Sequence, residues 1–224
     1  MIISGVQRCS TIDFPGSLAC VLFAAGCDLD CFYCHNRGLL TGAPALPGET
    51  VMGFLERRRG LLDGVVVSGG EPTLQRDLPD FLARLRAMGY RTKLDTNGQR
   101  PKAVPLELVD YVAVDWKAPR QAFPGVCGAG EEGYDRARAT LLRLLEAQIP
   151  CEARTTLYPG LTGAELLALA AELPPLPRYR LNFFRMPENF RPRDRERLAL
   201  HALTPGEIKD LEGELRRVQP NLTF

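Results

Sequence analysis

Short apolar runs alternate with longer amphipathic stretches along the 224-residue chain. The short runs are rich in β-branched and aliphatic residues, which is typical of buried strands. We expect strands over residues 17–23, 64–68, 91–95, 111–116, 151–156 and 179–184. Apolar residues recur at helical spacing between them, and we expect helices over residues 50–59, 77–88, 134–147, 163–173 and 205–218. Thr204 and Pro205 suit the N-cap and first position of the last helix.

This alternation predicts right-handed βαβ units and a parallel sheet. About six units fit in the chain, whereas a closed TIM barrel has eight and needs ~250 residues. The expected fold class is therefore α/β, a partial (β/α)6-type TIM barrel in a single domain over residues 1–224.

Polar and glycine-rich segments follow four of the expected strands. The strand at 17–23 leads into a cysteine-rich loop, and three others end at residues 69–72, 95–98 and 115–117. Parallel α/β folds bind ligands at the carboxyl ends of their strands. We therefore expect a functional site on this rim.

Three cysteines in the first of these segments are spaced C-x3-C-x2-C: Cys27, Cys31 and Cys34. Three thiolates are one ligand fewer than most closed clusters and structural zinc sites have, and soft thiolates suit iron–sulfur clusters. We predict a [4Fe–4S] cluster with one iron left open for a cofactor. The alternative is a zinc site. It would need a fourth ligand: His35, which directly follows Cys34 and rarely reaches the same ion, or else Cys9 or Cys20. The four other cysteines are expected to be buried or idle thiols: Cys9, Cys20, Cys127 and Cys151.

The other rim segments carry groups that suit an amino-acid ligand. Gly69 and Gly70 let the backbone approach a ligand closely. Glu71 can accept a hydrogen bond from an ammonium, or alternatively start a helical turn. The segment Asp95-Thr96-Asn97-Gly98 has the composition of a turn.

The strand end at 115–117 places Asp115 and Lys117 on one side and Trp116 on the other. Lys117 can neutralise a carboxylate or bond a ribose. Asp115 and Asp95 can pair with Lys117, an ammonium or a bound cation. The alternative is a surface salt bridge worth ~0–1 kcal/mol.

These motifs together resemble the radical S-adenosylmethionine (SAM) superfamily. The segments Ser10–Gly16, Cys34-His35-Asn36, Leu94–Gly98 and Tyr111–Lys117 narrow the resemblance to the activating proteins of glycyl-radical enzymes. Among these, the chain looks like the anaerobic ribonucleoside-triphosphate reductase activating protein over roughly residues 1–120. It departs from the family at Arg37, where proline is usual, and at Trp116, where a small aliphatic residue is usual.

The resemblance implies the fold above, a [4Fe–4S] cluster and SAM. Cys27, Cys31 and Cys34 would bind the cluster, and its open iron would chelate the methionine part of SAM. The SAM-binding residues would be Tyr33, through backbone atoms on the adenine, with Gly69, Gly70, Glu71, Asp95, Asn97, Asp115 and Lys117. Reductive cleavage would produce a 5′-deoxyadenosyl radical, and no residue would act as an acid or base.

The implied partners are a glycyl-radical enzyme, such as anaerobic ribonucleotide reductase, and a flavodoxin- or ferredoxin-type electron donor. Three alternatives stay open. One is a small-molecule enzyme similar to 7-carboxy-7-deazaguanine synthase, another a peptide-modifying enzyme, and the third a non-catalytic zinc or Fe–S module.

Charge and composition favour no nucleic acid or membrane partner, because 28 basic and 27 acidic residues nearly balance. No apolar run approaches the ~18 residues of a membrane span, and the N-terminus lacks a secretory signal pattern. We therefore expect a cytoplasmic protein whose seven cysteines are ligands or thiols. The run from Arg185 to Arg197 holds five arginines, and it is either a solvated face or a docking surface for a partner.

Overall fold

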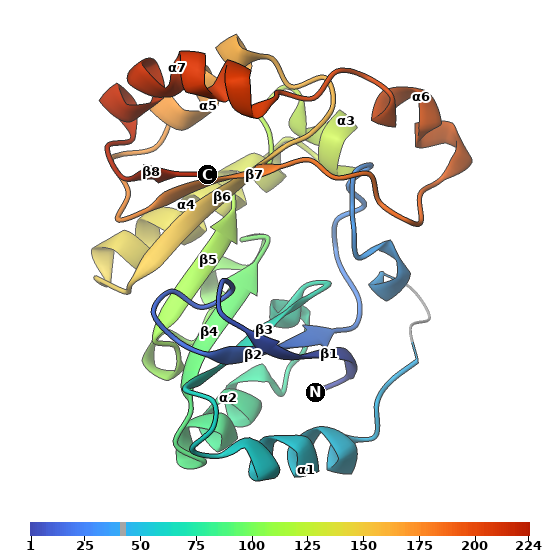
Figure 1. Cartoon of the computed structure of the whole chain (residues 1–224), viewed down its shortest axis with the longest axis vertical. Coiled ribbons are helices and arrows are strands. Elements are labelled where there is room, and N and C mark those ends of the chain that lie inside the picture. Colours follow the sequence, from blue (N-terminus) through green and yellow to red (C-terminus); the bar gives the residue numbers. More distant parts are fainter. Residues whose placement is uncertain (41–43) are drawn as a thin grey trace.

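A single sheet of eight strands in sequence order forms the framework of the computed structural model, which describes residues 1–40 and 44–224. The strands are β1 (Ile3–Ser10), β2 (Ala19–Ala24), β3 (Gly64–Gly69), β4 (Arg91–Thr96), β5 (Tyr111–Asp115), β6 (Cys151–Leu157), β7 (Tyr179–Phe183) and β8 (Leu222–Thr223). Strand β1 runs antiparallel to β2, and all other neighbours are parallel. Strands β1 and β8 form the two edges, so the sheet is an open barrel (Figure 1). The predicted α/β fold and open barrel are confirmed.

All five predicted helices are present, and the described residues contain two further short ones. The α-helices are α1 (Gly48–Arg58), α2 (Leu78–Ala87), α3 (Phe123–Cys127), α4 (Glu132–Glu146), α5 (Gly163–Ala171), α6 (Arg195–Leu198) and α7 (Pro205–Val218). Helix α7 begins as predicted: the Thr204 side chain accepts a hydrogen bond from the Glu207 amide, and the Glu207 carboxylate bonds back to Thr204. None of the helices in the described part of the chain is long and apolar enough to cross a membrane.

Strands β1 and β8 were not predicted. Strand β1 has the sequence ISGVQRCS, and only its first and last residues are buried, so it lacks the apolar run of the central strands. Strand β8 has two residues, too few to give a periodic pattern. Both strands form because a neighbouring strand supplies their hydrogen-bond partners, which is a tertiary effect.

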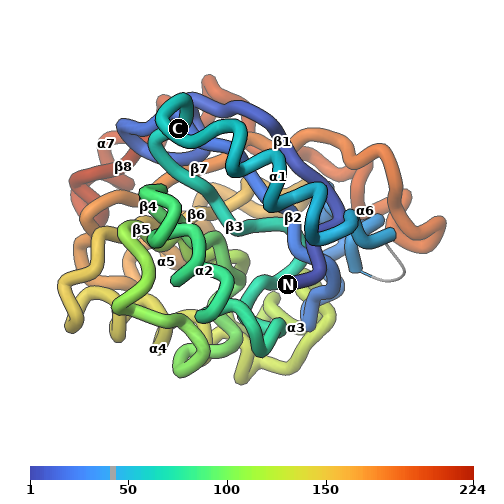
Figure 2. Tube along the Cα trace, turned by 90° about the horizontal axis from the view of Figure 1, so that it is seen from below, coloured from blue at the N-terminus to red at the C-terminus, as the bar shows by residue number. Residues whose placement is uncertain are grey.

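The two faces of the sheet have different surroundings. Alternate residues such as Val65 and Val67 point outward to the main core beneath α1, α2 and α4, which lie together outside the strands (Figure 2). Residues of the other parity, including Val66, form a smaller inner core around Phe14. The Phe14 ring lies 6.3 Å from the Tyr111 ring, and the Arg91 guanidinium stacks 4.8 Å from it. Phe14 thus closes the amino ends of the central strands.

Candidate functional site

The cysteine-rich loop follows β2 at the carboxyl end of the sheet, as predicted. Cys27, Cys31 and Cys34 all line a cavity of about 200 Å³. The same cavity is lined by six of the eight residues expected to bind SAM: Tyr33, Gly69, Gly70, Asn97, Asp115 and Lys117. Residues from the ends of four adjacent strands therefore meet at one place.

Backbone hydrogen bonds from distant segments hold this loop in place. The amides of Asp30 and Phe32 donate to the carbonyls of Cys127 (2.8 Å) and Val126 (3.2 Å) at the end of α3. Arg37, the residue that replaces the usual proline, donates to the Cys31 carbonyl at 2.8 Å and pairs with Asp30 at 2.8 Å. The departure at Arg37 thus adds contacts that brace the loop.

The loop thiols sit in an environment that opposes their ionisation when nothing is bound. Burial raises the pKa of Cys27 to about 12 and also raises the pKa of Cys34. Cys31 differs, because a hydrogen bond with the buried Cys127 thiol lowers its pKa to about 7. The Cys27 and Cys34 thiols become thiolates readily only beside positive charge, which bound iron would supply. The donor set therefore fits a metal cluster. Cys127, expected to be a buried or idle thiol, is buried and also hydrogen-bonds the Cys31 thiol.

The strand end at 115–117 has the predicted alternation. The Lys117 ammonium bonds the Asp115 carboxylate at 2.8 Å, and both residues line the cavity. Trp116 points the other way, where its indole donates to the Leu169 carbonyl at 2.9 Å and its ring packs on Tyr134. Burial alone would lower the pKa of Lys117, but Asp115 and the nearby thiols hold that pKa well above its usual value. Lys117 is therefore a permanent cation in the cavity wall, suited to a ligand carboxylate.

The two glycines serve the cysteine loop as well as the cavity. The Gly70 amide donates to the Ala24 carbonyl at 2.9 Å, and the Glu71 amide donates to the Gly26 carbonyl at 2.7 Å. A side chain at Gly70 would overlap the Gly26 carbonyl, and Gly69 has a φ of +114° beside Ala24. Gly69 and Gly70 were expected to let the backbone approach a ligand closely. They also let the end of β3 approach the backbone at Ala24 and Gly26 closely.

Glu71 lies outside the cavity lining and is fully buried. Its carboxylate accepts hydrogen bonds from the Thr73 amide (3.0 Å), the Thr73 and Thr96 hydroxyls and the Asn97 amide (2.6 Å). These contacts cap the short helix η2 (Pro72–Leu74). This is the turn-forming role named as an alternative for Glu71, and its carboxylate also fixes the backbone of Asn97.

Asn97 links β4 to the cysteine loop. Its amide nitrogen donates to the Asp28 carboxylate at 2.7 Å and lies 3.7 Å from the Cys27 sulfur. Hydrogen bonds to the sulfurs of a cluster are one of the factors that set its reduction potential. The sequence marked Asn97 as a SAM contact, and the structure adds this contact to a cluster ligand.

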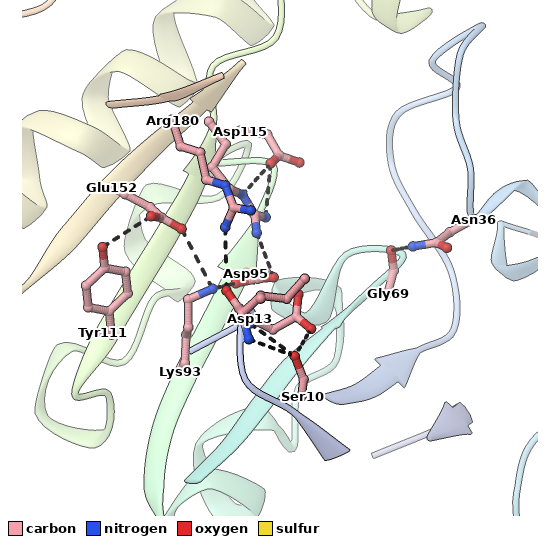
Figure 3. Close-up of polar contacts among 12 residues, drawn as sticks. Ser10, Asp13, Asn36, Gly69, Lys93, Asp95, Tyr111, Asp115, Glu152 and Arg180 are labelled. Atoms are coloured by element: carbon pink, nitrogen blue, oxygen red, sulfur yellow. Dashed lines mark hydrogen bonds and ion pairs between the residues drawn. The ribbon is translucent and has the colours of Figure 1, made fainter. Parts of the chain in front are cut away.

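Asp95 lies beneath the cavity in a buried network of charges (Figure 3). Lys93 bonds it at 2.6 Å and lies 3.9 Å from Glu152, both on the inner face of the sheet. The Arg154 guanidinium lies between Asp95 and Asp115 and pairs with both, at 2.9 Å from Asp95 and 3.1 Å from Asp115. The guanidinium thus occupies the place between the carboxylates that was considered for a bound cation. Sequence reasoning missed Arg154, although its position in the strand at 151–156 pointed it to the inner face.

The described residues include no group of three or more Cys, His, Asp or Glu side chains placed to hold one metal ion. The three thiols instead lie around the wall of one cavity, an arrangement that suits a multi-iron cluster. His35, the alternative fourth zinc ligand, also lines the cavity, and its ring lies 6.3 Å from the Phe184 ring.

Comparison with known proteins decides the family. The model of the radical SAM superfamily matches residues 21–173. The chain belongs to the radical SAM superfamily. Members of this superfamily use a [4Fe–4S] cluster and SAM, and the residues around the cavity fit both groups.

Relatives place this radical SAM enzyme among the glycyl-radical activating enzymes. A Methanocaldococcus jannaschii protein described as "putative glycyl-radical enzyme activating enzyme" is 31% identical over 73% of this chain and 71% of its own length. The pyruvate formate-lyase-activating enzyme of Clostridium pasteurianum is 31% identical over 59% of this chain, which spans three fifths (60%) of that enzyme.

A solved structure supports the fold. His-tagged anSMEcpe with bound AdoMet superimposes with a TM-score of 0.63 at 16% identity, over 89% of this chain and 61% of that one. At this identity the likeness concerns the arrangement of the strands and helices alone.

Proposed function

We propose that this radical SAM enzyme activates a glycyl-radical enzyme, with anaerobic ribonucleoside-triphosphate reductase as the partner. The observation that carries the proposal is the cavity in which Cys27, Cys31 and Cys34 face Lys117 and Asp115. The relatives described as activating enzymes support the reaction class. The motifs over residues 1–120 favour the reductase as the partner.

The role of the protein is to hold two groups in reactive geometry. Cys27, Cys31 and Cys34 would hold the cluster, and Lys117 would neutralise the SAM carboxylate. Asp115 keeps Lys117 charged, while Asn97 and the Gly69–Gly70 backbone would bound the cavity around SAM. The chemistry that these groups supply when bound is one-electron cleavage of SAM, which yields an organic radical able to abstract hydrogen. Closure of the site by the bound partner would keep water from that radical.

Protein substrates require access from outside the barrel. In the described part of the chain strands β1 and β8 do not pair, so backbone hydrogen bonds leave one side of the barrel open. An open side suits a glycine-bearing loop of a partner enzyme better than a small molecule that a closed pocket would surround. A flavodoxin- or ferredoxin-type protein is the proposed reductant.

The test is anaerobic reconstitution with iron and sulfide, followed by incubation with SAM, dithionite and purified anaerobic ribonucleotide reductase. We expect 5′-deoxyadenosine and a glycyl-radical doublet in the electron paramagnetic resonance spectrum of the reductase. A reductase whose radical glycine is replaced by alanine is the control. If 5′-deoxyadenosine forms without a radical on the reductase, the partner is wrong. If bound zinc and no 5′-deoxyadenosine are found, the enzyme assignment itself is wrong.

A further inference from the structure

A basic groove lies on the outer side of the cysteine loop. It has a volume of about 440 Å³ and lies between α3 and the segment from Arg191 to Arg197, with Asp30 on its wall. In Figure 1 this segment and α6 run beside the cysteine loop, on the opposite side of the molecule from α4. Three arginines line the groove: Arg191, Arg193 and Arg197.

Arg191 pairs with the two acids of the groove, whereas Arg193 faces solvent and Arg197 is half-buried. Arg191 pairs with Asp30 and lies 2.5 Å from the buried carboxylate of Asp194. Arg193 is 73% exposed and lies 3.9 Å from Asp30, too far for a hydrogen bond. The outward charge of the groove is therefore positive. The two acids that line the groove, Asp30 and Asp194, both pair with Arg191, and the exposed Glu196 is absent from the lining.

Among the residues that the structure describes, the groove and the cofactor cavity share the loop but no lining residue. Leu29, Cys31 and Tyr33 line the cavity, whereas Asp30 lines the groove. The Arg197 guanidinium stacks 4.0 Å from the ring of Phe32, the residue next to Cys31. One layer of loop thus separates the groove from a cluster ligand.

Because the loop separates the groove from the cofactor cavity, the groove suits one kind of partner better than another. A substrate that gives up a hydrogen atom must enter the SAM cavity, and a protein seated in the groove would be on the wrong side of the loop. An electron needs no such contact, because it can pass through one layer of side chains. Positive charge at the groove complements an acidic protein and speeds its diffusional encounter.

We propose that this groove is the docking surface for an acidic one-electron donor protein, such as a flavodoxin. The proposal rests on the proposed function, which requires an external electron. The donor loses one electron and the cluster gains it, with no atom transferred. Arg193 and Arg197 meet acidic side chains of the donor, and the donor cofactor lies toward the Phe32 side of the loop.

The test compares two charge reversals in the reconstituted holoenzyme. Arg193→Glu changes the groove, and Arg138→Glu changes an exposed arginine on α4. The dissociation constant for flavodoxin is measured by calorimetry at low and high salt, and 5′-deoxyadenosine formation is measured with either flavodoxin hydroquinone or dithionite. We expect Arg193→Glu to weaken flavodoxin binding about tenfold at low salt, with the difference shrinking at high salt. Arg138→Glu should change the dissociation constant less than about twofold. Arg193→Lys should keep most of the wild-type affinity.

Dithionite needs no docking surface, so both reversals should cleave SAM at the wild-type rate with it. The proposal is overturned if Arg193→Glu binds flavodoxin like the wild type, or if Arg138→Glu loses as much affinity. If the wild type forms no 5′-deoxyadenosine with dithionite, the proposed function fails, and this inference falls with it.

Discussion

Removing the Arg154 guanidinium should destabilise the fold and the Lys117 side of the cavity together. Arg154→Met keeps most of the volume but leaves the carboxylates of Asp95 and Asp115 with one lysine each, Lys93 and Lys117. Loss of one partner from a buried ion pair costs about 3–5 kcal/mol. We expect about 3 kcal/mol, the lower end, because both lysines remain.

The pH dependence of the unfolding free energy provides a second measure of the ion pair between Arg154 and Asp95. Burial alone would raise the pKa of Asp95, but Arg154 and Lys93 lower it to about 2 from 3.8. A carboxyl with a lowered pKa contributes stability that is full above pH 3.8 and is lost as the pH falls through about 2. For this shift the contribution is roughly 2–3 kcal/mol. The difference between wild type and Arg154→Met should therefore be largest above about pH 4 and shrink toward pH 2.

Urea unfolding of the metal-free protein under reducing conditions measures these differences. Arg59→Met is the matched control, because Arg59 pairs with Glu56 on the surface and its loss should cost below about 1 kcal/mol. The double variant Arg154→Met with Asp95→Asn should recover part of the lost stability, because it removes the excess negative charge that the loss of Arg154 leaves in the network. Equal stability of Arg154→Met and Arg59→Met, or no recovery in the double variant, would refute this account of the network.

Three further predictions concern the cavity. Cys31→Ala should abolish the absorption at about 400 nm expected for thiolate–iron charge transfer and stop SAM cleavage; retained activity would contradict the cluster assignment. Lys117→Ala should keep that absorption but weaken SAM binding at least about tenfold by calorimetry, whereas exposed Lys102→Ala should not; equal affinities would remove Lys117 from the SAM site. Gly70→Ala should displace the cysteine loop and lower the iron bound per chain, because its Cβ would overlap the Gly26 carbonyl; full iron loading would show that the loop can shift freely.

The sequence predicted the parts of the site that local pattern controls. Central strands such as 64–68 are continuous apolar runs, so their ends marked the rim and placed Lys117 and Asn97 near the cysteines. Alternation placed Trp116 opposite Lys117, and the structure confirms it. These inferences needed only the period of a strand and the rule for parallel sheets.

The parts that the sequence missed depend on contacts between distant residues. Arg154 meets Asp95 across 59 positions, and Asp30 meets the Cys127 carbonyl across nearly a hundred. The sequence also did not show that the Glu71 carboxylate accepts hydrogen bonds from Thr96 and Asn97, about 25 positions away, as well as from its neighbour Thr73. Pattern can place such groups on a face, and only packing decides which group each one meets.

The anchoring of the cysteine loop by α3 has a consequence for how the enzyme matures. The three cysteines leave the ribosome about a hundred residues before Val126 and Cys127, whose carbonyls receive the loop amides. Arg191, which pairs with Asp30, is made later still. A nascent chain therefore exposes its thiols well before their native geometry exists. We therefore expect the cluster to be inserted after synthesis of the chain. The free thiols need protection from oxygen most between their own synthesis and the folding of α3 and Arg191 against the loop.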